Sequence, residues 1–300
     1  MSRLLRVGTR KSPLALAQTQ LVVAALRRRD RAAEFEVVPL TTAGDRNRTV
    51  GGSPDFTDRI SAAVEAGEVD LAVHSAKDLP VRPERGVRIA AFPRRAAVAD
   101  VLVARPGLAL RPPVSGTRIG SSSVRRRAQL LREWPGVVVQ DVRGNVGTRI
   151  GLVDSGSVDA VVLAAAGLAR LGLAGRIDRT LPPTRFLPAP GQGALAVEVR
   201  YADRATDRVV RTIDHGPTRA AVTAERTCAA ALGADCDLPL AALARVRGET
   251  LTLDAELFDR NGRRSVRVRR EGPVVNAGSI GRLAGAALER TSESPTPGDR

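Results

Sequence analysis

The segment VDLAVHSAKDLP, residues 69–80, decides how the chain is expected to fold. Its first five residues form a largely apolar run between Gly67 and Pro80, which is typical of a strand buried in a parallel sheet. The run leads into a polar turn in which Lys77 stands beside Asp78. Ligands of open α/β sheets bind at loops that follow the carboxyl ends of strands. The turn is therefore a candidate site, although an isolated Lys-Asp pair is more often a solvated turn.

The same pattern recurs later in the chain. EAGEVDLAV at residues 65–73 is mirrored by DSGSVDAVV at residues 154–162. A strand, a serine-bearing turn and a helix, predicted over residues 4–29, recur over residues 118–134. This self-similarity indicates two lobes with one α/β plan, and the alternation of strand and helix favours parallel sheets. Two such lobes with facing loops form a cleft, which is a preferred place for a ligand.

The predicted elements divide the chain into three domains. We expect the first α/β lobe to comprise residues 1–93 and 194–213, and the second to comprise residues 99–187. Residues 216–290 show three antiparallel strands with a hairpin turn, flanked by helices, and are expected to form a small α+β C-terminal domain. The polar tail, residues 291–300, is expected to be disordered.

Composition limits the possible partners. The chain has 300 residues, of which 43% are hydrophobic and only 2% aromatic, and its formal net charge is +15. Such a charge attracts nucleic acid, acidic membrane surfaces or a small substrate with many carboxylates. Nucleic acid is disfavoured because stacking aromatics and zinc-finger or basic-zipper spacings are lacking. Neither a membrane-spanning run nor the apolar region of a signal peptide is evident, so we expect a soluble cytoplasmic protein.

The cysteines and histidines do not indicate a metal site. Cys228 and Cys236 lack the spacing of a metal-binding pair and are too few for a disulfide scaffold. Cys228 lies on an alanine-rich predicted helix and is expected to be a small core residue. His74 and His215 have no partners at metal-ligand spacing. We therefore expect no metal, and a structural role for His74.

Basic residues gather at the predicted turns. Ser12 is a good N-cap, and Arg10 beside it makes the start of this helix an anion site. Arg125 and Arg126 lie in the first turn of another helix, where cations are unfavourable for the helix itself, which suggests that they are placed for an anionic ligand. Arginine grips carboxylates at two points. A solvated basic face is the alternative. Three further arginines flank turns of the second lobe: Arg143, Arg149 and Arg170.

Seven short motifs follow one another along the chain: VGTRKSPLAL (7–16), AVHSAKDLP (72–80), GSSSVRR (120–126), VRGNVGTR (142–149), AGL (166–168), LPAPGQGA (187–194) and AER (224–226). Any one of them is a weak signal. Together, in this order and spacing, they make the chain resemble the hydroxymethylbilane synthase (porphobilinogen deaminase) family.

The resemblance implies three domains, the first two being periplasmic-binding-protein-like lobes around a cleft. It implies a transferase that condenses four porphobilinogen units head to tail, with release of ammonia, into the linear tetrapyrrole hydroxymethylbilane. The product would grow on a dipyrromethane cofactor attached covalently through Cys236, and Asp78 would be the catalytic carboxylate. We expect a monomer whose partners are porphobilinogen and the growing polypyrrole chain, without nucleic acid or membrane.

The resemblance also implies which residues bind the acetate and propionate groups that every pyrrole carries. Besides Cys236, the expected cofactor-binding residues are Lys77, Ser123, Arg125, Arg126, Arg143, Gln192 and Gly193. The expected substrate-binding residues are Arg10, Ser12, Arg149 and Arg170.

The chain departs from the family's pattern at three places. Ala234 and Asp235 stand where the family usually has a Gly pair before the cofactor cysteine, and Ala43 stands where Arg is common. The predicted lid, residues 46–58, contains no lysine. A divergent paralogue with an altered lid, which binds anions or has weak activity, is therefore the alternative hypothesis. A lobed binding protein without chemistry and a nucleic-acid-binding protein are the remaining ones.

Overall fold

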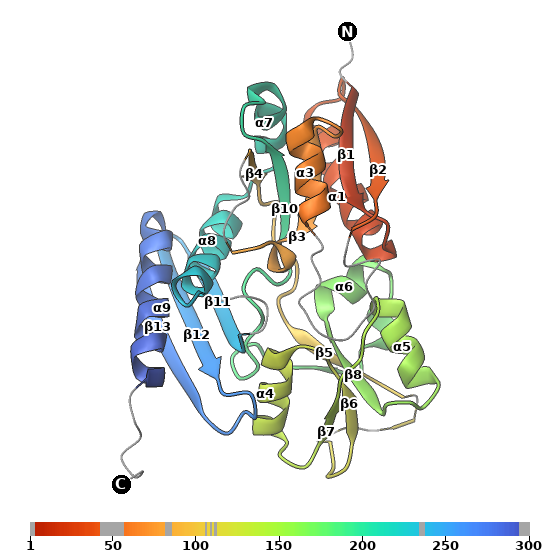
Figure 1. Cartoon of the computed structure of the whole chain (residues 1–300), viewed down its shortest axis with the longest axis vertical. Helices are drawn as coiled ribbons and strands as arrows, with labels where there is room; N and C mark the ends of the chain where they lie inside the picture. The colour runs from red at the N-terminus through yellow and green to blue at the C-terminus, as the bar shows by residue number, and fades with distance from the viewer. Residues whose placement is uncertain are drawn as a thin grey trace.

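The computed structural model describes residues 4–42, 57–81, 86–105, 107, 108, 110, 113–233 and 238–293. Within these residues the chain forms two five-stranded sheets, each with its own helices, and one three-stranded sheet packed on two helices (Figure 1). This confirms the expected mixed α/β class, with two lobes and a small α+β C-terminal domain.

The first lobe has the strand order β2-β1-β3-β10-β4. Its strands are β1 (Leu4–Arg10), β2 (Glu34–Leu40), β3 (Leu71–Ser75), β4 (Val87–Ala91) and β10 (Leu195–Arg200). The helices that pack against this sheet are α1 (Pro13–Arg29), α3 (Asp58–Ala66) and α7 (Arg204–Arg211). As predicted, α1 begins after the N-cap Ser12 with proline in its first turn, and its last turn holds three arginines, which favour the negative end of the helix dipole.

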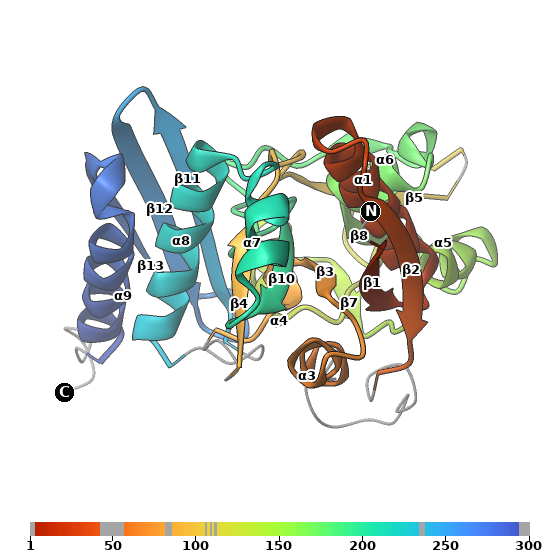
Figure 2. The same ribbon diagram turned by 90° about the horizontal axis from the view of Figure 1, so that it is seen from above.

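The second lobe has the strand order β7-β6-β8-β5-β9. Its strands are β5 (Asp100–Ala104), β6 (Arg118–Gly120), β7 (Val138–Gln140), β8 (Ala160–Ala164) and β9 (Arg179–Thr180). Its helices are α4 (Val124–Glu133), α5 (Val146–Asp154), α6 (Ala165–Arg170) and the short 3₁₀ turn η2 (Ala174–Arg176). The lobes meet where α1 of the first contacts α6 of the second (Figures 1 and 2).

The two sheets are not wholly parallel, so the prediction of parallel sheets was right for only part of each. In the first lobe β1 is parallel to β2 and β3, but β10 is antiparallel to β3 and β4. In the second lobe β6 is parallel to β7 and β8, but β5 is antiparallel to β8 and β9. β10 and β5 hold equivalent places, and each is the first strand after the chain crosses between lobes. Because they belong to the crossings and not to the repeated strand-helix units, the repeat did not reveal their direction.

The C-terminal domain is an antiparallel meander of three strands, as predicted. Its elements are α8 (Gly216–Ala231), β11 (Leu240–Arg247), β12 (Thr250–Phe258), β13 (Ser265–Pro273), η3 (Val274–Asn276) and α9 (Ala277–Glu293). One face of the sheet packs on α8 and α9 around Leu251, Leu253 and Leu288, which are wholly buried (Figure 2). In the part of the chain described, no helix combines the length and the apolar character that a membrane span needs.

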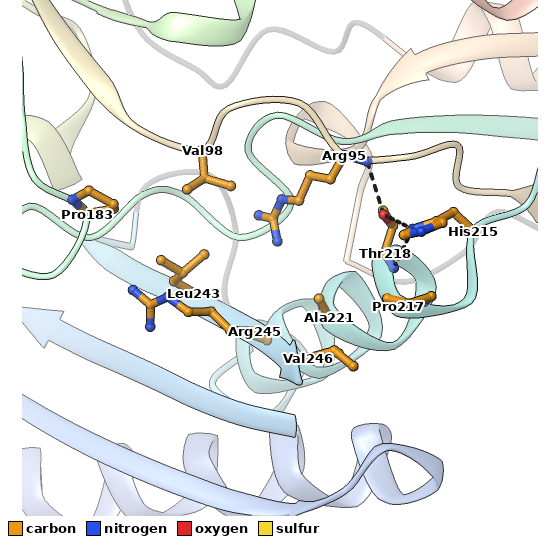
Figure 3. A pocket seen from close by; sticks show the side chains of 11 residues that line it. Arg95, Val98, Pro183, His215, Pro217, Thr218, Ala221, Leu243, Arg245 and Val246 are labelled. Carbon is orange, nitrogen blue, oxygen red and sulfur yellow. Dashed lines mark hydrogen bonds between the residues drawn. The ribbon is translucent and has the colours of Figure 1, made fainter. Parts of the chain in front are cut away.

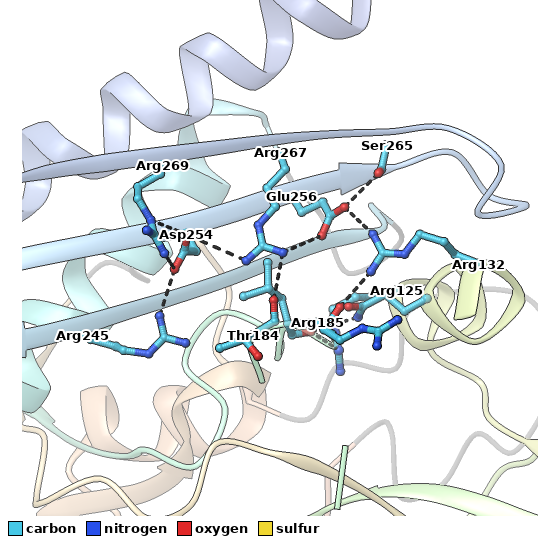
Figure 4. Close-up of polar contacts among 12 residues, drawn as sticks. Arg125, Arg132, Thr184, Arg185, Arg245, Asp254, Glu256, Ser265, Arg267 and Arg269 are labelled. Atoms are coloured by element: carbon cyan, nitrogen blue, oxygen red, sulfur yellow. Dashed lines mark hydrogen bonds and ion pairs between the residues drawn. The ribbon is translucent and has the colours of Figure 1, made fainter. Parts of the chain in front are cut away.

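The other face of this sheet docks on the second lobe through charged groups. Glu256 on β12 is buried and accepts a hydrogen bond from Arg132 of α4. Arg267 on β13 donates from Nη1 to the carbonyl of Thr184 at 3.0 Å. Asp254, also buried, pairs with arginines of both neighbouring strands (Figure 4). Because a buried carboxylate is stable only with such partners, the Asp254 pairs join the three strands, and the contacts of Glu256 and Arg267 hold the sheet against the lobe.

Gly262, in the hairpin turn between β12 and β13, is required where the C-terminal domain meets α4. Its φ of 68° is a conformation that side chains disfavour. A Cβ atom at this position would also overlap the carbonyl oxygen of Ala128 in α4. Glycine therefore serves both the turn and the close approach of the two domains.

Two alanine substitutions can separate the cost of the positive φ from the cost of the close approach to α4. Gly248→Ala is the matched control, because Gly248 has a φ of 56° but open space around the missing Cβ. We expect Gly248→Ala to lower the free energy of unfolding by about 1–2 kcal/mol through backbone strain. Gly262→Ala should lower it by roughly 1–3 kcal/mol more, because α4 must shift. Urea unfolding measures both, and equal losses would contradict the close packing of this turn on α4.

Candidate functional site

The turn η1 (Ala76–Asp78), here called the KD turn, follows the carboxyl end of the central strand β3. Its backbone is held firmly: the Ala76 N–H donates to the carbonyl of Ala194 at 3.0 Å. Gly191 packs so closely that a Cβ atom there would lie 3.1 Å from the Lys77 nitrogen. Ala76 is buried, whereas the side chains of Lys77 and Asp78 are exposed. The turn thus presents two charged groups from a fixed backbone.

Lys77 lies within electrostatic range of the second lobe. Its pKa is lowered, first because the surrounding protein withdraws the ammonium group from water, and further because Arg126 and Arg125 are positive. The charges of Asp78 and Asp100 act in the opposite direction. Part of the side chain keeps exposed surface, so the withdrawal from water is incomplete. A cation of the first lobe therefore stands close to charged groups of the second.

Those charged groups form a buried cluster around Asp100, the first residue of β5. Arg125 donates from Nη2 to Asp100 Oδ2 at 2.8 Å, and Arg126 donates from Nη2 to Asp100 Oδ1 at 2.7 Å. The Gln192 amide donates to Asp100 Oδ1 at 2.9 Å. Burial alone would raise the pKa of Asp100, but the two guanidinium groups hold it well below its usual range. Asp100 is therefore a fixed buried anion between two cations.

Arg125 and Arg126 do not form the solvated basic face considered from the sequence. Both side chains are buried, and their remaining contacts are with backbone carbonyls. Arg125 Nη1 donates to Leu187 at 2.7 Å, and Arg126 Nη1 donates to Val162 at 3.0 Å. A cation in the first turn of a helix is tolerated here because the Asp100 carboxylate neutralises it. Direct binding of a ligand by these two arginines stays a prediction.

Arg149, in the first turn of α5, lies within electrostatic range of the KD turn of the first lobe. It donates from Nε to the carbonyl of Gly144 at 3.0 Å. Burial is the largest effect that lowers its pKa, the positive Arg126 adds to it, and the negative Asp141 and Asp78 oppose it. The charge of Asp78, on the KD turn, is thus felt by an arginine of the other lobe. The fold of the two lobes brings these opposite charges within electrostatic range of each other.

Arg170 and Gly193 meet at the place where the chain crosses between lobes. We call residues 92–99 the first crossing segment and residues 181–194 the second. Arg170, at the end of α6, donates to the carbonyl of Gly193 at 2.7 Å, and burial lowers its pKa. Gly193 has a φ of 84°, and a Cβ atom there would lie 2.7 Å from the Ala97 carbonyl oxygen. Glycine is therefore needed at position 193 for the two segments to pass each other.

The remaining predicted site residues lie at the starts of helices and strand ends. Ser12 and Ser123 are the N-caps of α1 and α4, and each accepts a backbone N–H of its own first turn, at 3.3 and 3.4 Å. Each hydroxyl can still donate to a carboxylate. Arg10 is half-buried at the carboxyl end of β1. Arg143 is more exposed and forms a loose ion pair, Nε to Asp141 Oδ2 at 3.8 Å.

Several predictions fall outside the described residues: Cys236, Ala234, Asp235, Ala43 and most of the predicted lid. Cys228 is described and wholly buried in the core of the C-terminal domain, as expected. Burial and, to a smaller extent, the charge of Glu225 raise the pKa of its thiol to about 12, so the thiol stays protonated. Cys228 is therefore a poor nucleophile.

The two histidines have structural surroundings. His74 is buried with its Nε2 atom 3.4 Å from Glu198 Oε2. His215 is the N-cap of α8, where Nδ1 accepts the backbone N–H of Thr218. Among the residues that the structure describes, no group of three or more His, Cys, Asp or Glu side chains could hold a metal ion.

Sequence reasoning missed Asp100 and gave no role to Glu225, which it noticed only as part of a motif; both are buried acids that organise the site. Asp100 opens the apolar strand DVLVA, and Glu225 lies inside an alanine-rich helix. Glu225 accepts from Arg95 Nη1 at 2.7 Å, from the Gly191 N–H at 2.7 Å and from the Ala244 N–H at 2.8 Å. A lone acid within an apolar run is the signal that could have found both, since a buried carboxylate needs partners.

A separate cavity of about 230 Å³ lies between the first crossing segment and the C-terminal domain (Figure 3). Its walls are mainly apolar and include Val98 and Leu243. Arg95 at its edge is already engaged, since its backbone N–H donates to Thr218 at 3.1 Å and its guanidinium group pairs with Glu225. None of the predicted site residues lines this cavity, so it is distinct from the site between the lobes.

Comparison with known proteins identifies what the chain is similar to. The family described as "Porphobilinogen deaminase, dipyromethane cofactor binding domain" matches residues 5–208, and "Porphobilinogen deaminase, C-terminal domain" matches residues 219–290. The porphobilinogen deaminase of Thermus thermophilus is 43% identical over 280 residues, which cover 93% of each chain. That of Deinococcus radiodurans is 41% identical over 297 residues, covering 96% of each chain. A solved arginine-specific periplasmic binding protein of Salmonella typhimurium covers 70% of this chain and 91% of its own, with 14% identity and a TM-score of 0.43.

The buried acid of the site has a measurable role in stability. Asp100→Asn leaves two buried guanidinium groups without their anion and should lower the free energy of unfolding at pH 7 by about 3–5 kcal/mol. Asp141→Asn is the control, because Asp141 is exposed and its ion pair with Arg143 is loose; a change of about 0–1 kcal/mol is expected there.

The pH dependence of this difference follows from the lowered pKa of Asp100. The folded-state pKa of Asp100 lies below the unfolded value of about 3.9. The contribution of its carboxylate to the free energy of unfolding is therefore fully present above that value and is lost as the pH falls toward the folded pKa. Urea unfolding from pH 7 to pH 3 should therefore show the gap between wild type and Asp100→Asn narrowing only in acid. If Asp100→Asn at pH 7 loses no more free energy of unfolding than Asp141→Asn does, the stabilising role of the Asp100 cluster is contradicted.

Proposed function

Because the chain belongs to the porphobilinogen deaminase family, which it matches over residues 5–208 and 219–290, we propose that it makes hydroxymethylbilane. In this reaction four porphobilinogen units condense head to tail, each with loss of ammonia, on a dipyrromethane primer attached through Cys236. We further propose that the chain acts as a monomer.

The observation that carries the proposal is the position of Asp78 between cations of both lobes. Burial lowers the pKa of Lys77, its neighbour in the first lobe, and that of Arg149 in the second, and the negative charge of Asp78 opposes this lowering at both groups. The side chain itself is exposed on a backbone that is firmly held. This carboxyl group is thus available to a ligand that lies between the lobes.

This placement suits the chemistry of a pyrrole that loses ammonia. The departing amine leaves an electron-poor ring, whose positive charge spreads to the pyrrole N–H. A fixed carboxylate beside that N–H stabilises the charge as it develops. The carboxyl group of Asp78 can also carry a proton to the leaving amine and remove one from the newly joined ring.

The surrounding cations suit the carboxylates of the substrate. Lys77, Arg149 and Arg170 all have pKa values lowered mainly by burial. The protein therefore does not fully replace the hydration that these positive charges lose on burial, and a bound anion would stabilise them. Each pyrrole carries an acetate and a propionate, so a growing polypyrrole supplies several such anions. The excess of positive charge at the site would therefore bind these carboxylates.

The described residues also fit the primer. Arg125 Nε is buried without a hydrogen-bond partner among the residues described, although Asp100 and Leu187 occupy the other nitrogens. A primer carboxylate offers the acceptor that this donor lacks. Arg125, Lys77 and Ser123 would hold the group, and its free pyrrole carbon, when bound, supplies the nucleophile at which condensation starts.

The two cysteines provide the experiment that tests the proposal. Wild-type protein purified from a haem-producing host should show the added mass of a dipyrromethane by intact mass spectrometry and convert porphobilinogen to a tetrapyrrole. Cys236→Ser should lack both the added mass and the activity. Cys228→Ser, the matched control, should keep both, because that thiol is buried and protonated. An unmodified wild-type chain that binds porphobilinogen without turnover would contradict the proposal and favour an anion-binding protein.

Asp78→Asn tests the role of the carboxylate separately from primer attachment. The amide keeps the size of the side chain but neither carries the negative charge nor transfers the proton. We expect kcat to fall by about 10²-fold or more, while intact mass shows the primer still attached. Asp70→Asn is the control on the preceding strand region, since Asp70 pairs with Arg6 away from the KD turn. Normal turnover by Asp78→Asn would remove Asp78 from the mechanism.

A further inference from the structure

Arg226, on α8 of the C-terminal domain, reaches into the first lobe and holds the KD turn. Its Nη1 atom donates to the carbonyls of Ala76 and Leu79, both at 3.2 Å. Its Nη2 atom donates to the carbonyl of Pro80 at 2.6 Å. A single guanidinium group thus binds the backbone on both sides of Lys77 and Asp78.

The direction of the Asp78 side chain depends on this backbone. Within the described part of the chain, Asp78 makes no side-chain hydrogen bond, so no neighbouring side chain orients it. The carbonyls held by Arg226 belong to the two residues that follow Asp78 and to the residue that precedes Lys77. The rigid fork of an arginine can fix such a set of acceptors in one geometry, which a lysine cannot do equally well.

The surroundings of Arg226 support a firm attachment. The side chain is half-buried, and burial lowers the pKa of its guanidinium group, with the charge of Glu198 opposing this effect. Its neighbour Glu225 is fully buried and is bound by Arg95 and by the Gly191 N–H. This part of α8 is therefore fixed against both the first lobe and the second crossing segment.

The same helix leads toward the proposed site of primer attachment. α8 ends at Ala231, five residues before Cys236 in the sequence. One helix is thus tied to the turn that bears Asp78 and lies close in sequence to Cys236, which is outside the described residues.

We propose that Arg226 is a positioning residue for the reaction, acting through the KD turn to aim Asp78. This inference rests on the proposed function. The competing interpretation is that Arg226 only joins the C-terminal domain to the first lobe. Arg219 supplies the matched control, because it lies on the same helix and also reaches the first lobe. It donates to the Ala90 carbonyl at 2.6 Å and lies over the ring of Phe92, away from the KD turn.

The test compares Arg226→Ala with Arg219→Ala in the full-length chain. Intact mass spectrometry first selects protein with the primer attached, and steady-state kinetics with porphobilinogen then give kcat and KM. Arg226→Ala should lose kcat by about tenfold or more, because a small displacement of a catalytic group is sufficient for such a loss, while KM changes little. Arg219→Ala should keep kcat within about twofold of wild type even where its melting temperature falls equally. Added guanidinium ion at non-denaturing concentration should restore part of the kcat of Arg226→Ala only.

The outcomes separate the two proposals. Equal kcat for the two alanine variants, in the presence of active wild type, would overturn the role of Arg226 alone. Wild type without primer or product would overturn the proposed function and this inference with it. If Arg226→Ala does not fold, Arg226→Lys carries the test: a lowered kcat at a melting temperature near that of wild type supports the role, and an unchanged kcat refutes it.

Discussion

The carboxylate of Asp100, buried between Arg125 and Arg126, is the interaction on which the site depends. Two guanidinium groups without an anion between them would repel each other and could not be withdrawn from water. With Asp100 in place they are buried in one geometry, and the cluster keeps one positive charge in excess. The pKa of Lys77 is lowered first by burial and further by the positive charges of Arg126 and Arg125, so both arginines act on the first lobe despite the presence of Asp100. The cluster therefore stabilises the second lobe and leaves an excess of positive charge near the KD turn.

The crossing segments connect this cluster to the other two domains. Gln192 donates its amide to Asp100 at 2.9 Å, and its carbonyl accepts from Arg95 Nε at 2.8 Å. Arg95 in turn pairs with Glu225 of α8, which also binds the Gly191 N–H. A continuous set of hydrogen bonds thus runs from the C-terminal domain through both crossings to the second lobe. The domain proposed to carry the primer is therefore attached to the groups that are proposed to bind it.

Much of the fold could be predicted from local patterns. The strand and turn of residues 69–80, the repeated strand-helix units and the hairpin of the C-terminal domain all have signals within short stretches of sequence. The directions of β5 and β10 could not be predicted, because a strand that follows a crossing belongs to neither repeat. Its direction depends on how the chain enters the second sheet, which is a tertiary property.

The sequence predicted which types of residue belong to the site but only partly how they contact one another. The Lys-Asp pair and the arginines at helix starts were visible as candidates, and the structure brings charges of both lobes together. The neutralisation of Arg125 and Arg126 by Asp100 was not visible, because the acid lies 25 residues away from Arg125 in sequence and meets it only across the folded lobe. Glu225 was noticed within a motif, but its four hydrogen bonds join segments that are far apart in the chain.

Condensation of porphobilinogen at the site between the lobes, with loss of its amine, is the step that we propose for this chain. The most direct measurement is the amount of ammonia released for each tetrapyrrole formed when the purified wild-type chain is supplied with porphobilinogen. We expect four ammonia molecules for each tetrapyrrole. Binding of porphobilinogen without release of ammonia, or release without a tetrapyrrole, would contradict the proposed reaction.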